Sequence, residues 1–162
     1  MAYDDMFRDP LILLEFIERA LLIKKKFIEL DEFDQGIRNI FNYGHSFGHA
    51  IESATEFAIP HGIAVTIGMD MAITIATWRN LLSEDHYNRM HSVLSKNYAL
   101  YKSIEIPLDK LISALKKDKK NTAERLVLIM PMGDDASVQK IEVLADENFS
   151  AQCERFLRSL PL

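Results

Sequence analysis

Three of the five histidines, His45, His49 and His61, lie close together in the sequence. His45 and His49 are four residues apart, so on a helix their side chains leave the same face. Two imidazoles placed in this way can bind one divalent ion. His61 follows in a Pro-His-Gly break and could add a third nitrogen. The alternative is a set of core or surface histidines without a ligand, because such a pair arises readily by chance.

Other residues of this region have weaker signals. Glu52 shares the helix face of the two histidines and could orient an imidazole, but we favour its interpretation as a solvated carboxylate without a role. His86 and His91 lie in a polar segment and are interpreted as surface residues. Glycine inside a helix costs about 1 kcal/mol relative to alanine. Because five of the six glycines gather in this part of the chain, we expect the backbone to approach something closely there. They are Gly36, Gly44, Gly48, Gly62 and Gly68.

The elements that must position these side chains are mostly helices. Asp9-Pro10 predicts a helix start, and the apolar run that follows predicts a largely buried helix ending near Lys24 to Lys26. Further predicted helices run from Ile37 or Asn39 to Phe57, from Ile63 to about Asn80, from a Ser83 cap, from Leu108 to Lys117, and from Asp146 through Leu160. Residues 126–130 and 137–143 flank Gly133 and predict a β-hairpin. The fold class is therefore mainly α, with a small β-hairpin near the C-terminus.

Composition narrows the class of protein. The chain has 162 residues, 48% of them hydrophobic, a net charge of −5 and one cysteine. This length suits one globular domain, and a single cysteine excludes a disulfide framework. The acidic balance argues against nucleic acid as a partner. No apolar run is long enough to span a membrane, and no signal peptide is visible, so we predict a cytoplasmic protein without a membrane partner.

Several motifs together resemble the C-terminal domain of 3-dehydroquinate synthase, a sugar-phosphate cyclase. The resemblance extends from about Lys24 to about Met130. The most specific motif is Asn-Tyr-Gly-His-Ser-Phe-Gly-His-Ala-Ile-Glu at residues 42–52. The others, in matching order and spacing, are Asp31-Glu32, Gly36-Ile37-Arg38, His61-Gly62-Ile63-Ala64-Val65, Gly68-Met69 and Asp118-Lys119-Lys120-Asn121.

The resemblance implies a lyase of the shikimate pathway, which supplies aromatic amino acids. Members cyclise 3-deoxy-D-arabino-heptulosonate 7-phosphate to 3-dehydroquinate with loss of phosphate, using NAD and a divalent metal, zinc or cobalt. His45 and His61 match the metal-binding histidines, and His49 matches an active-site histidine with a polar or proton-transfer role. Residues that match substrate-contacting or catalytic positions are Lys24, Arg38 and Asn42, together with Lys119 or Lys120.

The same lysines and arginine have structural alternatives. Lys24 could finish a helix, Arg38 could pair with Asp31 or Asp34, and residues 116–120 could form a solvated charge run. One departure from the family is Ile63, where many members have glutamate after His-Gly.

The family's N-terminal NAD-binding domain and its third metal ligand, a glutamate, have no counterpart in this sequence. We therefore expect residues 1–162 to form the C-terminal metal- and substrate-binding domain, inactive by itself. Its expected partners are the missing nucleotide-binding domain, an anionic sugar phosphate and, in the full-length enzyme, a second copy. The alternatives are a cyclase with another substrate, the C-terminal domain of a metal-dependent polyol or alcohol dehydrogenase, and a non-catalytic helical module that binds a partner chain.

Overall fold

The chain divides into two compact units, Met1–Asn39 and Ile40–Leu162. The computed structural model describes residues 5–33, 36–101, 103–118 and 124–160. Among the described residues, no helix combines the length and the apolar character needed to cross a lipid bilayer.

The first unit is dominated by helix α2 (Pro10–Leu30). The predicted start is confirmed: the Asp9 carboxylate accepts a hydrogen bond from the Leu11 amide at 2.9 Å, with Pro10 in the first turn. The predicted burial is wrong, because α2 contains no buried residue and Leu11 is 75% exposed. Residues 5–33 and 36–39 contain no second long helix that could cover its apolar side chains. An apolar run therefore predicted the helix but not its burial.

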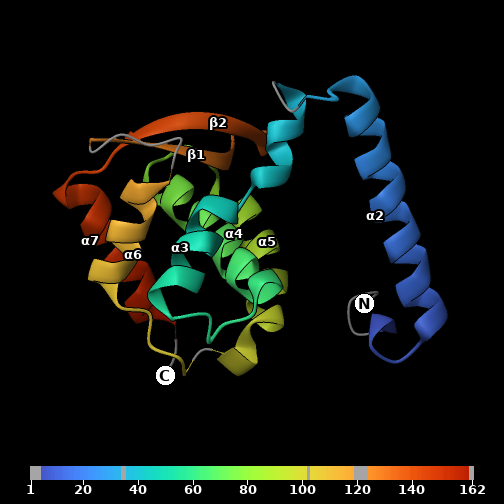
Figure 1. Cartoon of the computed structure of the whole chain (residues 1–162), viewed down its shortest axis with the longest axis horizontal. Coiled ribbons are helices and arrows are strands. Elements are labelled where there is room, and N and C mark those ends of the chain that lie inside the picture. Colours follow the sequence, from blue (N-terminus) through green and yellow to red (C-terminus); the bar gives the residue numbers. More distant parts are fainter. Residues whose placement is uncertain (1–4, 34–35, 102, 119–123, 161–162) are drawn as a thin grey trace. The chain divides into compact units, whose positions relative to one another are not determined.

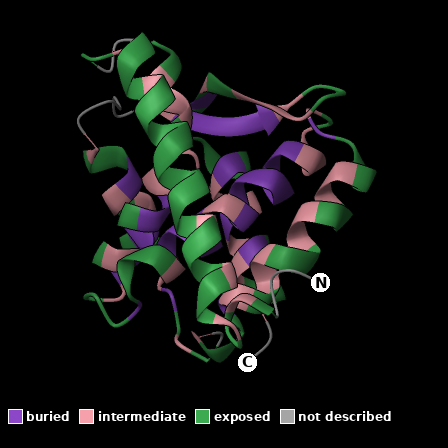
Figure 2. Cartoon of the chain, turned by 90° about the vertical axis from the view of Figure 1, so that its right-hand side faces the viewer, coloured by how far each residue is buried: buried purple, intermediate pink, exposed green. Residues whose placement is uncertain are grey.

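The second unit contains the core and the hairpin, and its mainly α fold with a β-hairpin confirms the predicted fold class (Figure 1). Its elements are η1, which begins in the first unit (Ile37–Asn42), α3 (His45–Ala54), α4 (His61–Trp78), α5 (Glu84–Asn97), η2 (Ala99–Tyr101), α6 (Leu108–Lys117), β1 (Arg125–Met132), β2 (Ser137–Leu144) and α7 (Glu147–Ser159). Helix α4 is the central element, in contact with α3, α5, β1 and α7. All of its residues from Ala64 to Ala76 except Met69 are buried. Figure 2 colours the buried parts of the chain purple, and they lie on helices and on a strand.

The predicted continuous helix up to Phe57 is wrong, because the chain breaks into η1 and α3 at Tyr43 and Gly44. Gly44 has φ +78°, a left-handed conformation that side chains with a Cβ rarely adopt. A Cβ at Gly44 would also lie 2.8 Å from the Val65 carbonyl oxygen. The expectation of close backbone approach is confirmed here, at Gly48 and at Gly68, whereas Gly62 has nothing within 4 Å of its would-be Cβ.

The remaining helices and the two strands lie where the local sequence predicted them. Ser83 and Asp146 cap α5 and α7, as predicted, and α6 has the predicted bounds. Strands β1 and β2 pair antiparallel, with Leu126 opposite Val143 and Met132 opposite Ser137. Leu126, Leu128 and Met130 alternate along β1, and their side chains are buried in the same core as those of the helices. One face of the strand therefore packs against the helices.

Candidate metal centre

The three predicted histidines lie in one cluster. His45 is the first residue of α3, His49 follows one turn later, and His61 is the first residue of α4. The ring centroids are 5.7 Å apart for His45 and His49, 5.7 Å for His45 and His61, and 5.6 Å for His49 and His61. The structure thus brings together, in a nearly equilateral triangle, side chains from two helices.

Backbone contact between α3 and α4 sets this spacing. A Cβ at Gly48 would lie 2.8 Å from Val65 Cα, and one at Gly68 would meet the Gly48 amide nitrogen at 2.8 Å. Only glycine lets two helices pack this closely. After α3, the Phe57 amide donates a hydrogen bond to the Glu52 carbonyl at 2.8 Å, which closes the helix end before the chain reaches Pro60. The second helix can then begin at His61, beside the first.

His45 is held by the main chain. Its Nδ1 lies 3.3 Å from the Tyr43 carbonyl oxygen. A carbonyl only accepts hydrogen bonds, so Nδ1 carries the proton and Nε2 keeps its lone pair. Burial lowers the pKa of His45 and outweighs the hydrogen bond to the Tyr43 carbonyl, which acts in the opposite direction. At neutral pH the ring is therefore a neutral imidazole, the form that binds metal ions.

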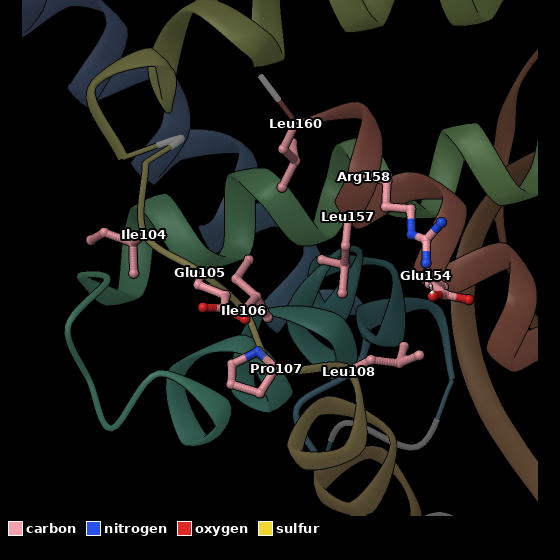
Figure 3. A pocket seen from close by; sticks show the side chains of 9 residues that line it. All are labelled: Ile104, Glu105, Ile106, Pro107, Leu108, Glu154, Leu157, Arg158 and Leu160. Atoms are coloured by element: carbon pink, nitrogen blue, oxygen red, sulfur yellow. Dashed lines mark hydrogen bonds and ion pairs between the residues drawn. The ribbon is translucent and has the colours of Figure 1, made fainter. Parts of the chain in front are cut away.

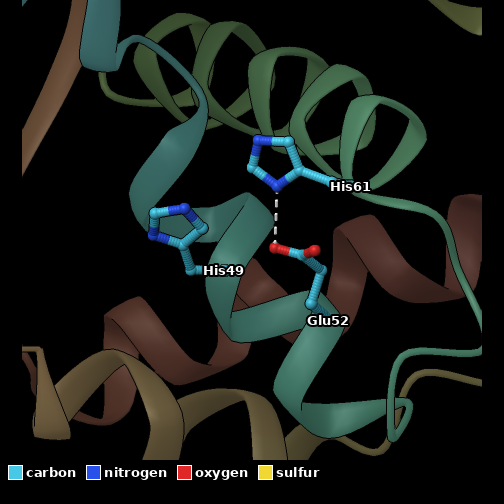
Figure 4. A group of neighbouring side chains, drawn as sticks. All are labelled: His49, Glu52 and His61. Carbon is cyan, nitrogen blue, oxygen red and sulfur yellow. Dashed lines mark hydrogen bonds and ion pairs between the residues drawn. The ribbon is translucent and has the colours of Figure 1, made fainter.

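His61 is held by a carboxylate. Its Nδ1 lies 3.0 Å from Glu52 Oε2, as Figure 4 shows. The Glu52 side chain is only 12% exposed, against 56% for His61. The interpretation of Glu52 as a solvated carboxylate is therefore wrong. His49, Glu52 and His61 offer ligand atoms that all lie within 4.8 Å of one another, so this group could hold a metal ion.

The predicted substrate-binding residues are distributed over both units. Lys24 is an exposed residue of α2, and Arg38 lies in η1, both in the first unit. The guanidinium of Arg38 donates to the carbonyl oxygens of Glu32 at 2.7 Å and Asp31 at 3.2 Å. Arg38 therefore stabilises the turn after α2. This role is similar to the structural alternative given above, in which Arg38 pairs with an aspartate of that turn. Its role toward a substrate, like that of Lys24, stays a prediction.

Asn42 is the last residue of η1, is half-buried and belongs to the second unit. Lys119 and Lys120 lie outside the described residues. His49 lines a pocket of about 340 Å³ between α3 and α6, whose polar residues include Ser46, Ser53 and Lys117. This pocket brings His49 together with hydroxyl and charged groups within a partly apolar lining, as is common in ligand-binding pockets.

A larger pocket, of about 560 Å³, lies between residues 104–108 and α7 (Figure 3). Its walls include Ile106, Pro107 and Leu157, and its Arg158 is engaged by Glu154 at 2.6 Å. None of the predicted site residues lines it. We therefore place the candidate site at the histidines rather than in this apolar pocket.

The sequence interpretation missed a buried polar cluster centred on Asp70. Asp70 is fully buried, and both of its carboxylate oxygens lie within 2.9 Å of His91 Nδ1. The Tyr98 hydroxyl also donates to Asp70, and burial together with Asp70 raises the pKa of Tyr98. The interpretation of His91 as a plain surface residue is thus incomplete. A single acid within the apolar sequence of α4 was the available signal, because a buried carboxylate requires partners.

Comparison with known proteins adds independent evidence. The family model for the 3-dehydroquinate synthase C-terminal region matches residues 3–121. The 3-dehydroquinate synthase of Wolinella succinogenes is 37% identical over 134 residues, which cover 78% of this chain and 37% of the relative. That of Corynebacterium diphtheriae is 33% identical over 140 residues, covering 82% of this chain and 37% of the relative. This chain therefore spans little more than a third of the length of these relatives.

Solved structures agree with the sequence relatives. A crystal structure of 2-deoxy-scyllo-inosose synthase superposes with a TM-score of 0.69 at 25% identity, covering 89% of this chain and 40% of that one. A second structure of such a synthase, complexed with carbaglucose-6-phosphate, NAD+ and Co2+, gives a TM-score of 0.60, also at 25% identity, covering 78% and 36%. By its sequence match, its fold and the histidine motif, the chain belongs to the 3-dehydroquinate synthase family, whose C-terminal domain it resembles.

Proposed function

We propose that this chain is the metal- and substrate-binding part of a sugar-phosphate cyclase that converts 3-deoxy-D-arabino-heptulosonate 7-phosphate to 3-dehydroquinate with loss of phosphate. The main support for the proposal is the triangle formed by His45, His49 and His61. Their ring centroids are 5.6 to 5.7 Å apart, and the residues lie at the positions of the family's motif. Membership of the family supports it, as does the Co2+ bound by a structural neighbour.

The residues present fit a divalent ion such as zinc or cobalt. His45 and His61 each have Nδ1 next to an acceptor, the Tyr43 carbonyl and the Glu52 carboxylate, so Nε2 is the ring nitrogen that would hold the ion. When bound, such an ion makes substrate hydroxyls more acidic and polarises a carbonyl. The chain's part is to orient the two imidazoles.

Other side chains are proposed to bind the substrate or to transfer its protons. His49 lines the pocket between α3 and α6 and is proposed to transfer protons to or from the sugar. Cationic and amide side chains suit the phosphate and carboxylate of the substrate, because Arg binds such groups in a bidentate manner and Lys acts as a point charge. The proposed set is Lys24, Arg38, Asn42, Lys119 and Lys120.

Hydride transfer requires NAD, which we assign to a nucleotide-binding domain outside these 162 residues. Residues 1–162 would then be the C-terminal domain of a two-domain enzyme that works as a homodimer. The coverage of 37% of the relatives' length supports this division. By itself the chain should turn over no substrate and show no affinity for NAD.

One other function has specific support. The synthase bound to carbaglucose-6-phosphate favours a related cyclase that acts on a hexose phosphate. A polyol dehydrogenase would use the same metal-binding histidines without phosphate loss. A non-catalytic helical module that binds a partner chain would leave the histidine cluster without a use.

A domain exchange tests these possibilities. The part of the Wolinella succinogenes enzyme that precedes its match to this chain is fused to residues 1–162. The chimera is then assayed with NAD+ and Co2+ for phosphate release from the heptulosonate phosphate, phosphate release from glucose 6-phosphate, and NADH formation from glycerol. The proposal expects release from the heptulosonate phosphate alone. Release only from glucose 6-phosphate, or NADH from glycerol, would support the corresponding alternative.

Variants connect that activity to the cluster. His45→Ala and His61→Ala in the chimera should each lower phosphate release by about 100-fold or more, because the ion loses one of the two imidazoles that this chain provides. His86→Ala is the matched control, since His86 binds the Asp134 carbonyl at 2.8 Å and should leave the rate unchanged. Turnover by residues 1–162 alone would refute the two-domain division.

A further inference from the structure

We infer that Glu52 is a positioning residue that fixes the tautomer of His61 and so presents Nε2 of that ring to a divalent ion. This inference rests on the proposed metal-binding function and adds a residue to it. Glu52 belongs to α3 and His61 to α4, so the contact also joins the two helices of the cluster. The two atoms, Glu52 Oε2 and His61 Nδ1, are 3.0 Å apart.

The chemistry of the pair determines which nitrogen carries the proton. An ionised carboxylate can only accept hydrogen bonds, so His61 Nδ1 must be the donor. In a neutral ring, Nε2 is then unprotonated and able to bind an ion. Figure 4 shows this second nitrogen on the side of the ring that points away from Glu52. The carboxylate thus selects both the tautomer and the direction of the imidazole.

Burial makes the carboxylate effective in this role. The Glu52 side chain is 12% exposed, whereas that of its partner is 56% exposed. A carboxylate that is mostly removed from water loses much of its hydration and gains more from a hydrogen bond to an imidazole. The exposed and otherwise mobile ring is therefore held by a fixed acceptor, as in carboxylate–histidine–metal arrangements.

Glu52 could instead be a ligand, because its ligand atom and those of His49 and His61 lie within 4.8 Å of one another. The parallel with His45 favours positioning: the Nδ1 of that ring also faces an oxygen acceptor, the Tyr43 carbonyl at 3.3 Å. Both rings then use Nδ1 for the protein and Nε2 for the ion. The two roles differ in which nitrogen of His61 is protonated and in whether Glu52 touches the ion.

The tautomer can be measured without any metal. Long-range ¹H–¹⁵N spectra of the metal-free 162-residue chain at pH 8 should show His61 protonated at Nδ1. In Glu52→Ala the ring should shift toward the Nε2-protonated form, which a solvent-exposed histidine side chain prefers in water. A wild-type His61 protonated at Nε2, or an unchanged tautomer in Glu52→Ala, would overturn the inference.

Cobalt binding separates positioning from ligation. Titration with Co2+, followed by calorimetry and visible absorption, should give a 10- to 100-fold weaker affinity for Glu52→Ala, as expected for loss of an outer partner. Glu52→Gln keeps the size and an acceptor oxygen, so its loss should be smaller, with absorption bands at the wild-type wavelengths. Shifted bands in Glu52→Gln would mean that Glu52 is a ligand, and unchanged affinity in Glu52→Ala would mean that it has no role.

A matched control and the folding check complete the design. Glu56→Gln removes a carboxylate just after α3 that pairs with Lys110 at 2.9 Å, so its cobalt affinity should equal that of wild type. Circular dichroism checks that each variant folds, and Glu52→Gln serves if Glu52→Ala does not. A wild-type chain that binds no cobalt would count against the proposed metal-binding function, whereas the tautomer measurement would still decide the role of Glu52.

Discussion

Each of the two predicted metal-binding histidines has one ring nitrogen bonded to the protein. Nδ1 of His45 faces a main-chain carbonyl and Nδ1 of His61 faces Glu52. Rings held in this way have lost much of their rotational freedom before an ion arrives, so binding costs less conformational entropy. At the scale of single residues, the site is thus largely pre-organised, and this supports its assignment to ligand binding.

Asp70 is predicted to be the most sensitive polar residue of the core. Asp70→Ala would leave the buried Tyr98 hydroxyl and the His91 ring without their shared acceptor. Loss of such a partner should lower the free energy of unfolding by about 3 kcal/mol in urea denaturation. Asp85→Ala, at an exposed acid in the first turn of α5, is the control and should cost less than about 1 kcal/mol. A similar cost for both variants would contradict the role given to the cluster.

Cys153 provides a prediction for alkaline pH. Burial raises the pKa of this thiol to about 12, from 9.0. The unfolded thiol ionises above pH 9 and the folded one does not, so its contribution to stability is complete below pH 9 and is lost as pH rises toward 12. From pH 8 to pH 9.5 the free energy of unfolding should fall by about 0.8 kcal/mol more in wild type than in Cys153→Ala. Equal pH slopes in urea denaturation would refute this.

At the scale of elements, the contact between α3 and α4 should tolerate no added methyl group. Gly68→Ala would place a Cβ against backbone atoms of Gly44 and Gly48, so its free energy of unfolding should fall by about 3 kcal/mol. Gly62→Ala is the matched control in the same helix, because nothing lies within 4 Å of its would-be Cβ. It should be neutral or stabilising by up to about 1 kcal/mol. Thermal or urea unfolding of the two variants compares them directly.

Features that depend on neighbouring residues could be predicted from the sequence, whereas features that depend on residues far apart in the chain could not. Caps at Asp9, Ser83 and Asp146 are local, so the starts of three helices followed from neighbouring residues. The break at Gly44 depends on Val65 and Met69, and the partner of Asp70 lies on another helix. Such contacts between distant residues leave no local pattern in the sequence. The exposure of α2 had no local signal in the sequence either. The histidine cluster was accessible because its motif is distinctive and its spacing is helical.

At the scale of the whole molecule, the core is confined to one unit. Every buried residue among those described lies in Ile40–Leu162, so a chain of residues 40–162 should keep a cooperative thermal transition within about 3 °C of the full chain. A control chain of residues 1–145 removes Phe149, Cys153 and Phe156 from the core and should lose that transition. A chain 40–162 that does not unfold cooperatively would show that the first unit is needed for folding.

The glycine contact between α3 and α4 also bears on how this site can evolve. Because the positions of His45, His49 and His61 are set by two backbones in direct contact, they do not depend on exposed side chains elsewhere in the unit. Exposed residues of the hairpin and of α7 can therefore drift in sequence while the spacing of the histidines persists. Such a scaffold can acquire new substrates through changes around an inherited pair of helices, and in protein engineering it offers a rigid frame whose surroundings are open to redesign.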